Sequence, residues 1–141
     1  MPILNIRNVQ KSYKMGRSDT LNVLKGIDLE IEEGQIIAVI GPSGVGKSTL
    51  LQIIGALDKP TSGDVEIDGQ NLFQYDDNKL AQLRNQTVGF IFQFHHLLPE
   101  FTAIENIMMP ALIAGKQKNA VKDRALELLE KVGLQDRGTH R

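Results

Sequence analysis

The sequence predicts an α/β fold that begins with an antiparallel β region. Residues 27–32 alternate apolar and charged side chains, which is the period-2 pattern of a strand with one face in water. Residues 36–40 read Ile-Ile-Ala-Val-Ile without a polar break, as is typical of a short strand buried on both faces of a parallel sheet. Apolar side chains then recur at helical spacing from Leu50 to Leu57, and Gly34 favours a turn between the two strands.

The middle of the chain predicts a hairpin strand, a short helix and a second buried strand. Residues 64–68 alternate acidic and apolar side chains and run into an Asp-Gly turn pair. Leu80 and Leu83 predict a short helix. Residues 88–92 are again of the buried type, and residues 95–101 form an expected loop that contains a proline.

Two helices are expected in the last third of the chain. Thr102 and Glu105 have the spacing of a capping box, which opens the first helix, and Pro110 would bend it. Its predicted inner face consists of Ile104, Ile107, Met108 and Leu112. The apolar stripe of the second helix consists of Val121, Ala125, Leu128, Leu129 and Val132. Gly133 stands where a C-terminal glycine would end that helix.

The composition is that of a globular domain, and it excludes several classes of protein. A hydrophobic fraction of 41% with 23% charged residues is enough for an ordinary core. The net charge of −1 is too small for a nucleic-acid surface or a polybasic membrane anchor. The lack of cysteine excludes a disulfide framework and a thiolate metal site. From the net charge, no nucleic-acid partner is expected. No signal peptide and no apolar run of ~18 residues are found, so a cytoplasmic location is expected.

Residues 41–48 read GPSGVGKS and match the phosphate-binding loop G-x-x-x-x-G-K-[ST], between a buried-type strand and a helix. Glycines let the loop turn its N–H groups towards phosphates, and the helix N-terminus adds partial positive charge. Lys47 would contact the β- and γ-phosphates, Ser48 would ligate Mg²⁺, and Thr49 could offer its hydroxyl to the α-phosphate. The predicted binding residues are Gly41, Pro42, Ser43, Gly44, Val45, Gly46, Lys47, Ser48 and Thr49. The loop therefore predicts a P-loop NTPase core.

The residues around this loop resemble the ABC ATPases. Tyr13 precedes the loop, a Pro-Thr-Ser-Gly segment at residues 60–63 follows its helix, and Gln93 ends the second buried-type strand. The resemblance implies ATP as the nucleotide, with Tyr13 stacking on the adenine. It implies that Gln93 contacts Mg²⁺ or the attacking water and senses a membrane partner, and that Lys47 and Gln93 serve catalysis. An aromatic residue after a strand more often serves packing, but the accompanying motifs favour the base-stacking role for Tyr13.

Residues 89–106, which read GFIFQFHHLLPEFTAIEN, narrow the resemblance to the ATPase subunits of lipoprotein-releasing transporters and the related macrolide exporters. Residues 57–63 and the pair Arg84-Asn85 fit the same group. The resemblance implies a subunit that couples ATP binding and hydrolysis to export, with lipoprotein release from the inner membrane as its process. It also implies membrane-spanning partner subunits, a second ATPase copy bound head to tail, and a peripheral location on the cytoplasmic face of that membrane.

The resemblance covers the whole chain but only the front part of a family member, which implies one incomplete ABC ATPase domain within residues 1–141. The expected parts are a mostly antiparallel β region (1–35 and 61–75), the P-loop core (36–60 and 86–94) and the start of the α-helical subdomain (95–141). The family's L-S-G-G-Q signature and catalytic glutamate have no counterpart here. This chain alone is therefore expected to be inactive in hydrolysis, and its unpaired strands are expected to make it self-associate.

Several alternatives stay open from the sequence. The chain could be a truncated module that binds nucleotide or docks on a membrane subunit without turnover, or belong to another kind of ABC protein. A GTPase or nucleotide kinase is disfavoured because the N-K-x-D motif with which GTPases read their base is missing. His95 and His96 are adjacent and therefore point in different directions, which disfavours a shared metal ion. Met108 and Met109 favour packing rather than cofactor binding.

Overall fold

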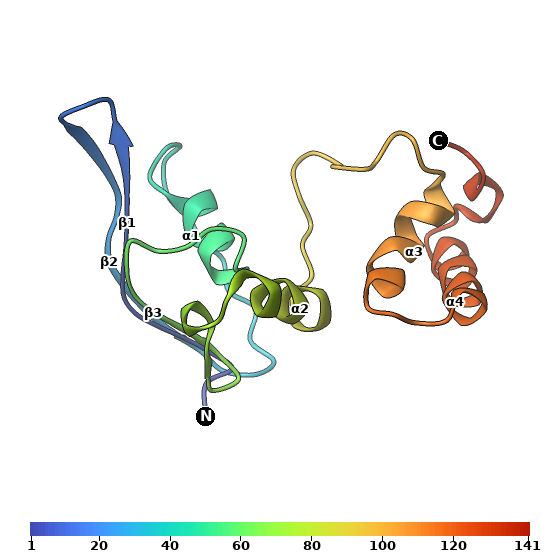
Figure 1. Cartoon of the computed structure of the whole chain (residues 1–141), viewed down its shortest axis with the longest axis horizontal. Helices are drawn as coiled ribbons and strands as arrows, with labels where there is room; N and C mark the ends of the chain where they lie inside the picture. The colour runs from blue at the N-terminus through green and yellow to red at the C-terminus, as the bar shows by residue number, and fades with distance from the viewer. The chain divides into compact units, whose positions relative to one another are not determined.

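The computed structural model describes residues 1–141, which divide into two compact units, Met1–Arg84 and Asn85–Arg141 (Figure 1). The elements in chain order are β1 (Leu4–Met15), β2 (Asp19–Ile31), α1 (Lys47–Ile54), β3 (Ser62–Ile67), β4 (Gln70–Asn71), the short 3₁₀ helix η1 (Leu72–Gln74), α2 (Asp77–Thr87), α3 (Ala103–Ile113), α4 (Lys118–Lys131) and the 3₁₀ helix η2 (Gln135–Arg137). No helix has both the length and the apolar character that a membrane span requires. The predicted division into β region, core and helical subdomain stays a prediction.

The first unit is built on an antiparallel sheet with strand order β2-β1-β3-β4. In β1 the buried residues are Leu4, Ile6 and Val9, so the spacing changes from two residues to three. The change occurs because the strand registers shift after Ile6 and Arg7, where Asn8 adopts φ 46°. This bulge interrupts the period-2 pattern, and for that reason alternation alone does not single out β1.

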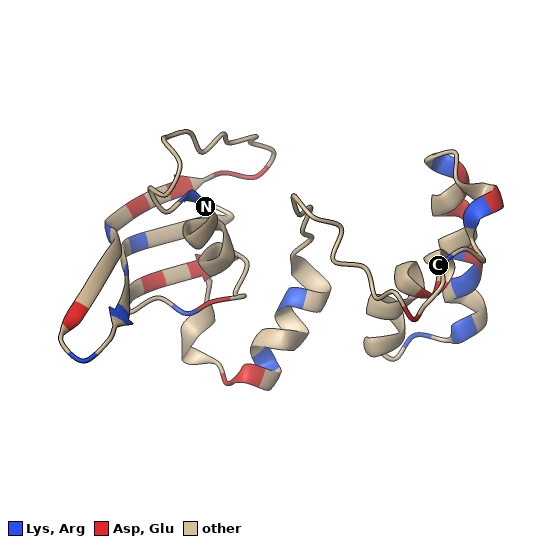
Figure 2. Cartoon of the chain, turned by 90° about the horizontal axis from the view of Figure 1, so that it is seen from above, with Lys and Arg blue, Asp and Glu red and all other residues tan.

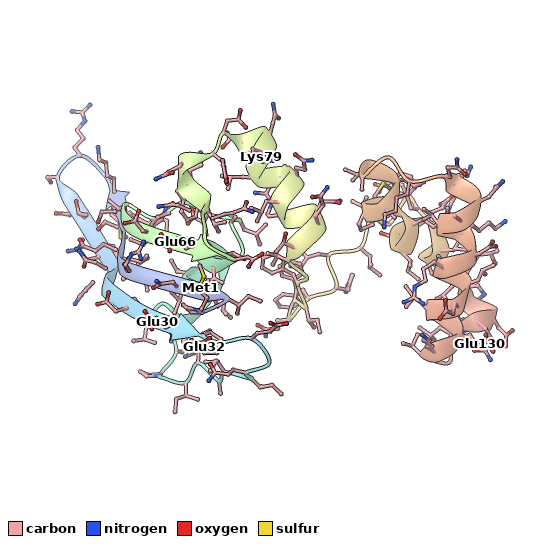
Figure 3. The ribbon with its side chains drawn as sticks, turned by 90° about the horizontal axis from the view of Figure 1, so that it is seen from below. Met1, Glu30, Glu32, Glu66, Lys79 and Glu130 are labelled. Atoms are coloured by element: carbon pink, nitrogen blue, oxygen red, sulfur yellow. The ribbon has the colours of Figure 1, made fainter.

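The two half-exposed strands predicted from alternation are confirmed. The segment 27–32 forms the end of β2, which begins earlier than predicted, at Asp19. The hairpin between β3 and β4 turns at Asp68 and Gly69, whose φ values of 49° and 72° are those of a tight two-residue turn. Asn5 of β1 pairs with Glu30 of β2 and with Glu66 of β3, so polar side chains of three strands share one face (Figure 3).

The opposite face of the sheet packs on α1, η1 and α2. The fully buried side chains of this core are Ile6, Val9, Ile53, Val65, Leu72 and Leu80. Each such side chain contributes roughly 1.5–3 kcal/mol relative to an exposed one. The short helix predicted from Leu80 is confirmed as α2. The predicted stripe of α1 is wrong at its end, because the helix stops at Ile54 and leaves Leu57 exposed.

The two buried parallel strands predicted at residues 36–40 and 88–92 are wrong for this structure. Neither segment pairs with a strand, and Ile36 and Ile91 are fully or almost fully exposed. A central strand needs a backbone partner on each side and a layer on each face. The sheet described here contains only the four antiparallel strands, so neither condition is met within these residues.

The second unit consists of α3 and α4. The predicted capping box is confirmed: the Thr102 hydroxyl accepts from the Glu105 backbone N–H, and the Glu105 carboxylate accepts from that of Thr102 at 2.8 Å. Pro110 lies inside α3, and Gly133, with φ 74°, follows α4 as predicted.

The packing between α3 and α4 is narrower than the predicted apolar stripes. Met108, Val121 and Ala125 are buried together, with Ile104 and Ile107 packed against them. Leu112, Leu128 and Val132, which were predicted to face the core, are exposed. The prediction is wrong at these positions because two packed helices cover only one side of each other.

Candidate functional site

The predicted phosphate-binding loop connects directly to α1, which begins at Lys47 immediately after Gly46. Gly44 and Gly46 adopt φ values of 79° and 107°, a region that costs a residue with a side chain about 1–2 kcal/mol. A Cβ atom on Gly46 would lie 3.0 Å from side-chain atoms of Val23 and Leu24, whereas one on Gly44 would meet open space. A glycine is therefore needed at position 44 only for its backbone conformation, whereas Gly46 also allows the loop to pack closely on β2.

The start of α1 carries concentrated positive charge without a negative partner. No side chain caps its N-terminus, so the first-turn N–H groups have no side-chain acceptor. The Lys47 ammonium donates to the carbonyl oxygens of Gly41 and of Pro42, the latter at 2.7 Å, and forms no ion pair. Both partners are neutral, so an arriving phosphate oxygen would be the stronger acceptor.

The hydroxyl residues predicted for the site lie on this first turn. Ser48 is exposed, and Thr49 is half-buried, so the Ser48 hydroxyl can be reached from solvent. The next residue, Leu50, is buried in the core and fixes the helix against the sheet. The structure therefore brings the predicted residues Gly41 to Thr49 together around one helix end.

A hollow of about 390 Å³ lies beside the loop, between β2 and the residues Gly44 and Val45. Its remaining lining residues are Leu21, Asn22, Val23, Leu24, Lys25 and Ile27. Charges of both signs are interspersed on the sheet and on α4 (Figure 2), so the positive character of the loop is a local property of Lys47 and the helix end.

Tyr13 lies near the end of β1, where it pairs with Leu21 of β2. Its side chain is 38% exposed, and its hydroxyl donates a hydrogen bond of 2.9 Å to the Asp58 carboxylate. Tyr13 therefore belongs to the same unit as the predicted phosphate-binding loop, and its strand partner Leu21 lines the hollow beside that loop. Its predicted stacking on adenine stays a prediction.

Gln93 lies in an exposed loop of the second unit, rather than at the end of a buried strand as predicted. The side chains before it form an aromatic group: Phe90 and Phe92 stack at 5.3 Å between ring centroids, and His96 meets Phe92 edge-on at 4.7 Å. The predicted contact of Gln93 with Mg²⁺ or water stays a prediction.

Asn106 of α3 holds the loop that follows Gln93, a function that the sequence patterns did not indicate. Its side-chain oxygen accepts from the Leu98 backbone N–H at 2.9 Å, and its amide group donates to the carbonyls of Leu98, Phe101 and Thr102. An asparagine four residues after a helix N-cap is the only signal that could have suggested this.

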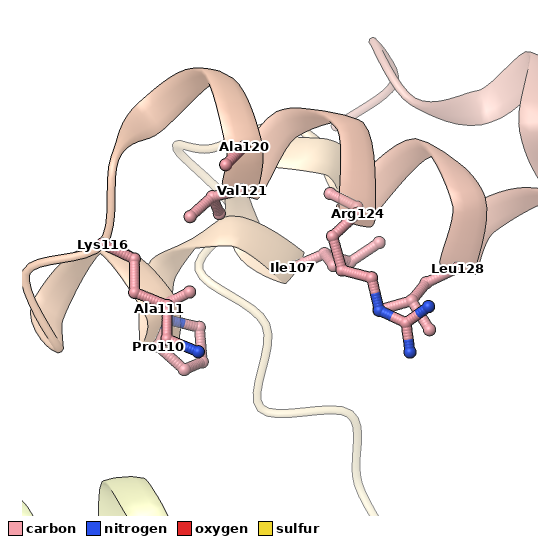
Figure 4. Close-up of a pocket in the computed structure, with 9 residues that line it drawn as sticks. Ile107, Pro110, Ala111, Lys116, Ala120, Val121, Arg124 and Leu128 are labelled. Carbon is pink, nitrogen blue, oxygen red and sulfur yellow. The ribbon is translucent and has the colours of Figure 1, made fainter.

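A groove of about 370 Å³ between α3 and α4 lies entirely within the second unit (Figure 4). It is lined by Ile107, Pro110, Ala111, Lys116, Ala120, Val121, Arg124, Ala125 and Leu128. The groove is mostly apolar and contains none of the predicted nucleotide-binding residues, so it is not a candidate for the phosphate site.

Comparison with protein families decides which class of protein carries this loop. The family model described as ABC transporter matches residues 24–141. The chain belongs to the ABC transporter family.

Its predicted fold class, an ABC ATPase core with an N-terminal antiparallel sheet followed by helices, is confirmed by solved structures of that family. One, described as a dimeric ATP-binding cassette in a post-hydrolysis state with ADP and Pi bound, has a TM-score of 0.90 at 39% identity and covers 98% of this chain and 61% of that one. A second, described as a dimeric bacterial ABC transporter cassette, has a TM-score of 0.87 at 40% identity over 96% of this chain and 60% of that one.

Within the ABC transporter family, the chain is similar to proteins named lipoprotein-releasing system ATP-binding protein LolD. The chain is 52% identical to the LolD of Geobacter metallireducens over 139 residues, covering 99% of this chain and 61% of that protein. It is 48% identical to the LolD of Bacteroides thetaiotaomicron, of which it covers 62%. The group that the sequence resembled is thus confirmed, and the chain spans about three-fifths of the length of these curated relatives.

Proposed function

We propose that this chain binds ATP as part of the ATPase subunit of a membrane transporter that releases lipoproteins. The observation that carries the proposal is the helix end at Lys47, where a lysine ammonium lies against two neutral carbonyls and no side chain caps the helix. Phosphate groups match this arrangement because they offer negative charge and several acceptor oxygens to a cation and to backbone N–H groups. The similarity to LolD proteins supports the choice of transporter.

The residues present also fit a Mg²⁺ ion bound with the nucleotide. Ser48 is exposed on the first turn of α1, next to Lys47, and hydroxyl and amide oxygens are the hard ligands that Mg²⁺ accepts. Ser48 would hold the ion, which would neutralise charge on the β- and γ-phosphates when bound. Lys47 would bind the same phosphates, and Thr49 would donate its hydroxyl to the α-phosphate. For Gln93, the proposed roles as a Mg²⁺ ligand and in positioning the attacking water rest on the family resemblance alone.

The proposed partners follow from the relatives. A dimeric cassette with ADP and Pi bound is among the similar structures, which supports two copies of the ATPase subunit acting together. We propose that they associate head to tail and engage membrane-spanning transporter subunits. This assembly would place the subunit peripherally on the cytoplasmic face of the inner membrane.

Replacing the loop lysine tests the nucleotide site. Lys47→Ala removes a charge-assisted donor worth about 1.5–3 kcal/mol, so the affinity for Mg-ATP in a calorimetric titration should fall by at least about tenfold. Lys79→Ala is the matched control, because Lys79 is an exposed lysine of α2 that forms no ion pair. If Lys47→Ala and Lys79→Ala bind Mg-ATP as the unchanged chain does, the phosphate-binding assignment is wrong.

A second measurement separates an ATPase subunit from a module that binds nucleotide without turnover. Phosphate release is measured for the chain alone and for the chain mixed with a full-length ABC ATPase subunit. Residues 1–141 contain no counterpart of the family's signature and catalytic glutamate, so the chain alone is expected to be inactive. Stimulated release in the mixture supports participation in a composite site, and binding without any stimulation supports the module.

A further inference from the structure

We propose that Lys11 and Asp58 position Tyr13 as a one-sided platform for the base of the bound nucleotide. The inference rests on the proposed function, because it takes the triphosphate to lie on residues 41–48. Lys11 and Asp58 are positioning residues in this account: they would hold the Tyr13 ring and would not contact the phosphates.

Tyr13 is the aromatic side chain of the first unit that remains available for stacking. Residues 1–84 contain three aromatic residues, Tyr13, Phe73 and Tyr75. Phe73 and Tyr75 pack against the hydrophobic core, whereas Tyr13 does not and keeps 38% of its surface exposed. The phosphate-binding loop recognises only the charged end of a nucleotide, and an exposed aromatic face provides the complementary surface for a base.

The Tyr13 ring is fixed at two places. Its hydroxyl donates to one carboxylate oxygen of Asp58 at 2.9 Å, and the Lys11 ammonium binds the other at 3.0 Å. The same ammonium donates to the Lys59 carbonyl at 2.6 Å and lies 4.9 Å from the centroid of the Tyr13 ring. Lys11 therefore covers one ring face by a cation–π contact and leaves the other face for a ligand.

The ion pair between Lys11 and Asp58 is itself partly buried. The Lys11 side chain is only 13% exposed and that of Asp58 is 31% exposed. Burial raises the pKa of Asp58, but hydrogen bonds from Lys11, from Tyr13 and from the Lys59 backbone outweigh it, and the pKa lies below its ordinary value. The carboxylate is thus ionised at neutral pH and is a strong acceptor for the Tyr13 hydroxyl.

The same elements hold the platform and the loop. Lys11 pairs with Leu24 of β2, whose side chain contacts the position of Gly46 in the loop. Tyr13 lies two residues farther along β1, or about 7 Å. Asp58 follows α1, the helix that the loop opens, and its backbone N–H is bound to the carbonyl of Gln52 in that helix. A base on Tyr13 and phosphates at the loop would therefore contact one continuous surface of the first unit.

A comparison of two ligands tests the inference. Titrations with ATP and with inorganic triphosphate, which has no base, are carried out on the unchanged chain and on Asp58→Ala and Tyr13→Phe. Each substitution should weaken ATP binding about fivefold, because a stacked base loses its fixed partner, and should change triphosphate binding less than about twofold. The double variant should lose no more than either single one, because both changes break the same contact.

Asp77→Ala is the matched control, since Asp77 is an exposed carboxylate that pairs with Lys59 and does not contact Tyr13. It should leave both affinities unchanged. If Asp58→Ala does not fold, Asp58→Asn, which keeps an oxygen acceptor but loses the charge, and Tyr13→Phe carry the same test.

Each outcome has a distinct meaning. Equal losses for ATP and triphosphate, or no loss of ATP affinity, would overturn the positioning role of Lys11 and Asp58. An unchanged chain that binds neither ligand would instead overturn the proposed function, as would binding that does not depend on Lys47.

Discussion

Gly63 is the position where one added methyl group should perturb the first unit most. This glycine, in β3, adopts φ 92°, and a Cβ atom there would lie 2.4 Å from the Asn8 carbonyl oxygen and 2.7 Å from that of Arg7. These oxygens belong to the bulge of β1, so both are backbone atoms that cannot rotate away. The glycine of the Pro-Thr-Ser-Gly segment is therefore required by the close approach of two strands.

The expected loss of stability for Gly63→Ala follows from two costs. The left-handed backbone conformation costs about 1–2 kcal/mol for a residue with a side chain, and forcing a methyl group into a filled space costs about 1–3 kcal/mol more. Gly34→Ala is the matched control: Gly34 has φ 81°, but a Cβ atom there would meet nothing within 4 Å. The control should therefore lose only the first cost, about 1–2 kcal/mol.

The measurement is urea unfolding followed by tyrosine fluorescence. Tyr13 and Tyr75 are the two tyrosines, the chain has no tryptophan, and both tyrosines lie in Met1–Arg84, so the signal reports on the first unit. A difference between Gly63→Ala and Gly34→Ala of less than about 0.5 kcal/mol would refute the close approach as the reason for the glycine.

Two further predictions concern the second unit and the exposed apolar segment at residues 36–40. Hydrogen bonds from Arg124 and, to a smaller extent, from Lys131 lower the pKa of Glu127 from 4.5 to about 2. Their contribution to the stability of the folded chain is therefore fully present above pH 4.5 and is lost as the pH falls through about 2. Thermal melts by circular dichroism should show Glu127→Gln as slightly less stable than the unchanged chain at neutral pH and equal to it below about pH 2, and a difference independent of pH contradicts this. Ile36 and Ile40 are 98% and 89% exposed, so the chain should self-associate in light-scattering measurements. The double substitution Ile36→Ser with Ile40→Ser should reduce this self-association. A monomeric unchanged chain would show the prediction to be wrong.

Features that depend on neighbouring residues were predictable from the sequence. The capping box at Thr102 and the hairpin turn at Asp68 depend on contacts within a few residues, and both were predicted and confirmed. The loop at residues 41–48 is also local, since its glycines and the helix that follows act over one short segment. The ABC transporter family was indicated by short contiguous sequence motifs and was confirmed by the match to the family model.

Strand pairing and side-chain clusters were decided only by the tertiary structure. Whether residues 36–40 and 88–92 form strands depends on partners that a local apolar run does not specify, and here they have none. The bulge of β1 matters because Gly63, far along the chain, packs against it.

The sequence by itself therefore determined the position of the glycine-rich loop before α1, the capping and the turns, because their energies arise between residues close in the chain. The tertiary structure decided that Lys11, Tyr13 and Asp58 form one cluster, although Asp58 follows Tyr13 by 45 residues. No spacing rule brings such residues together, because their contact depends on how β1 and the end of α1 pack in space.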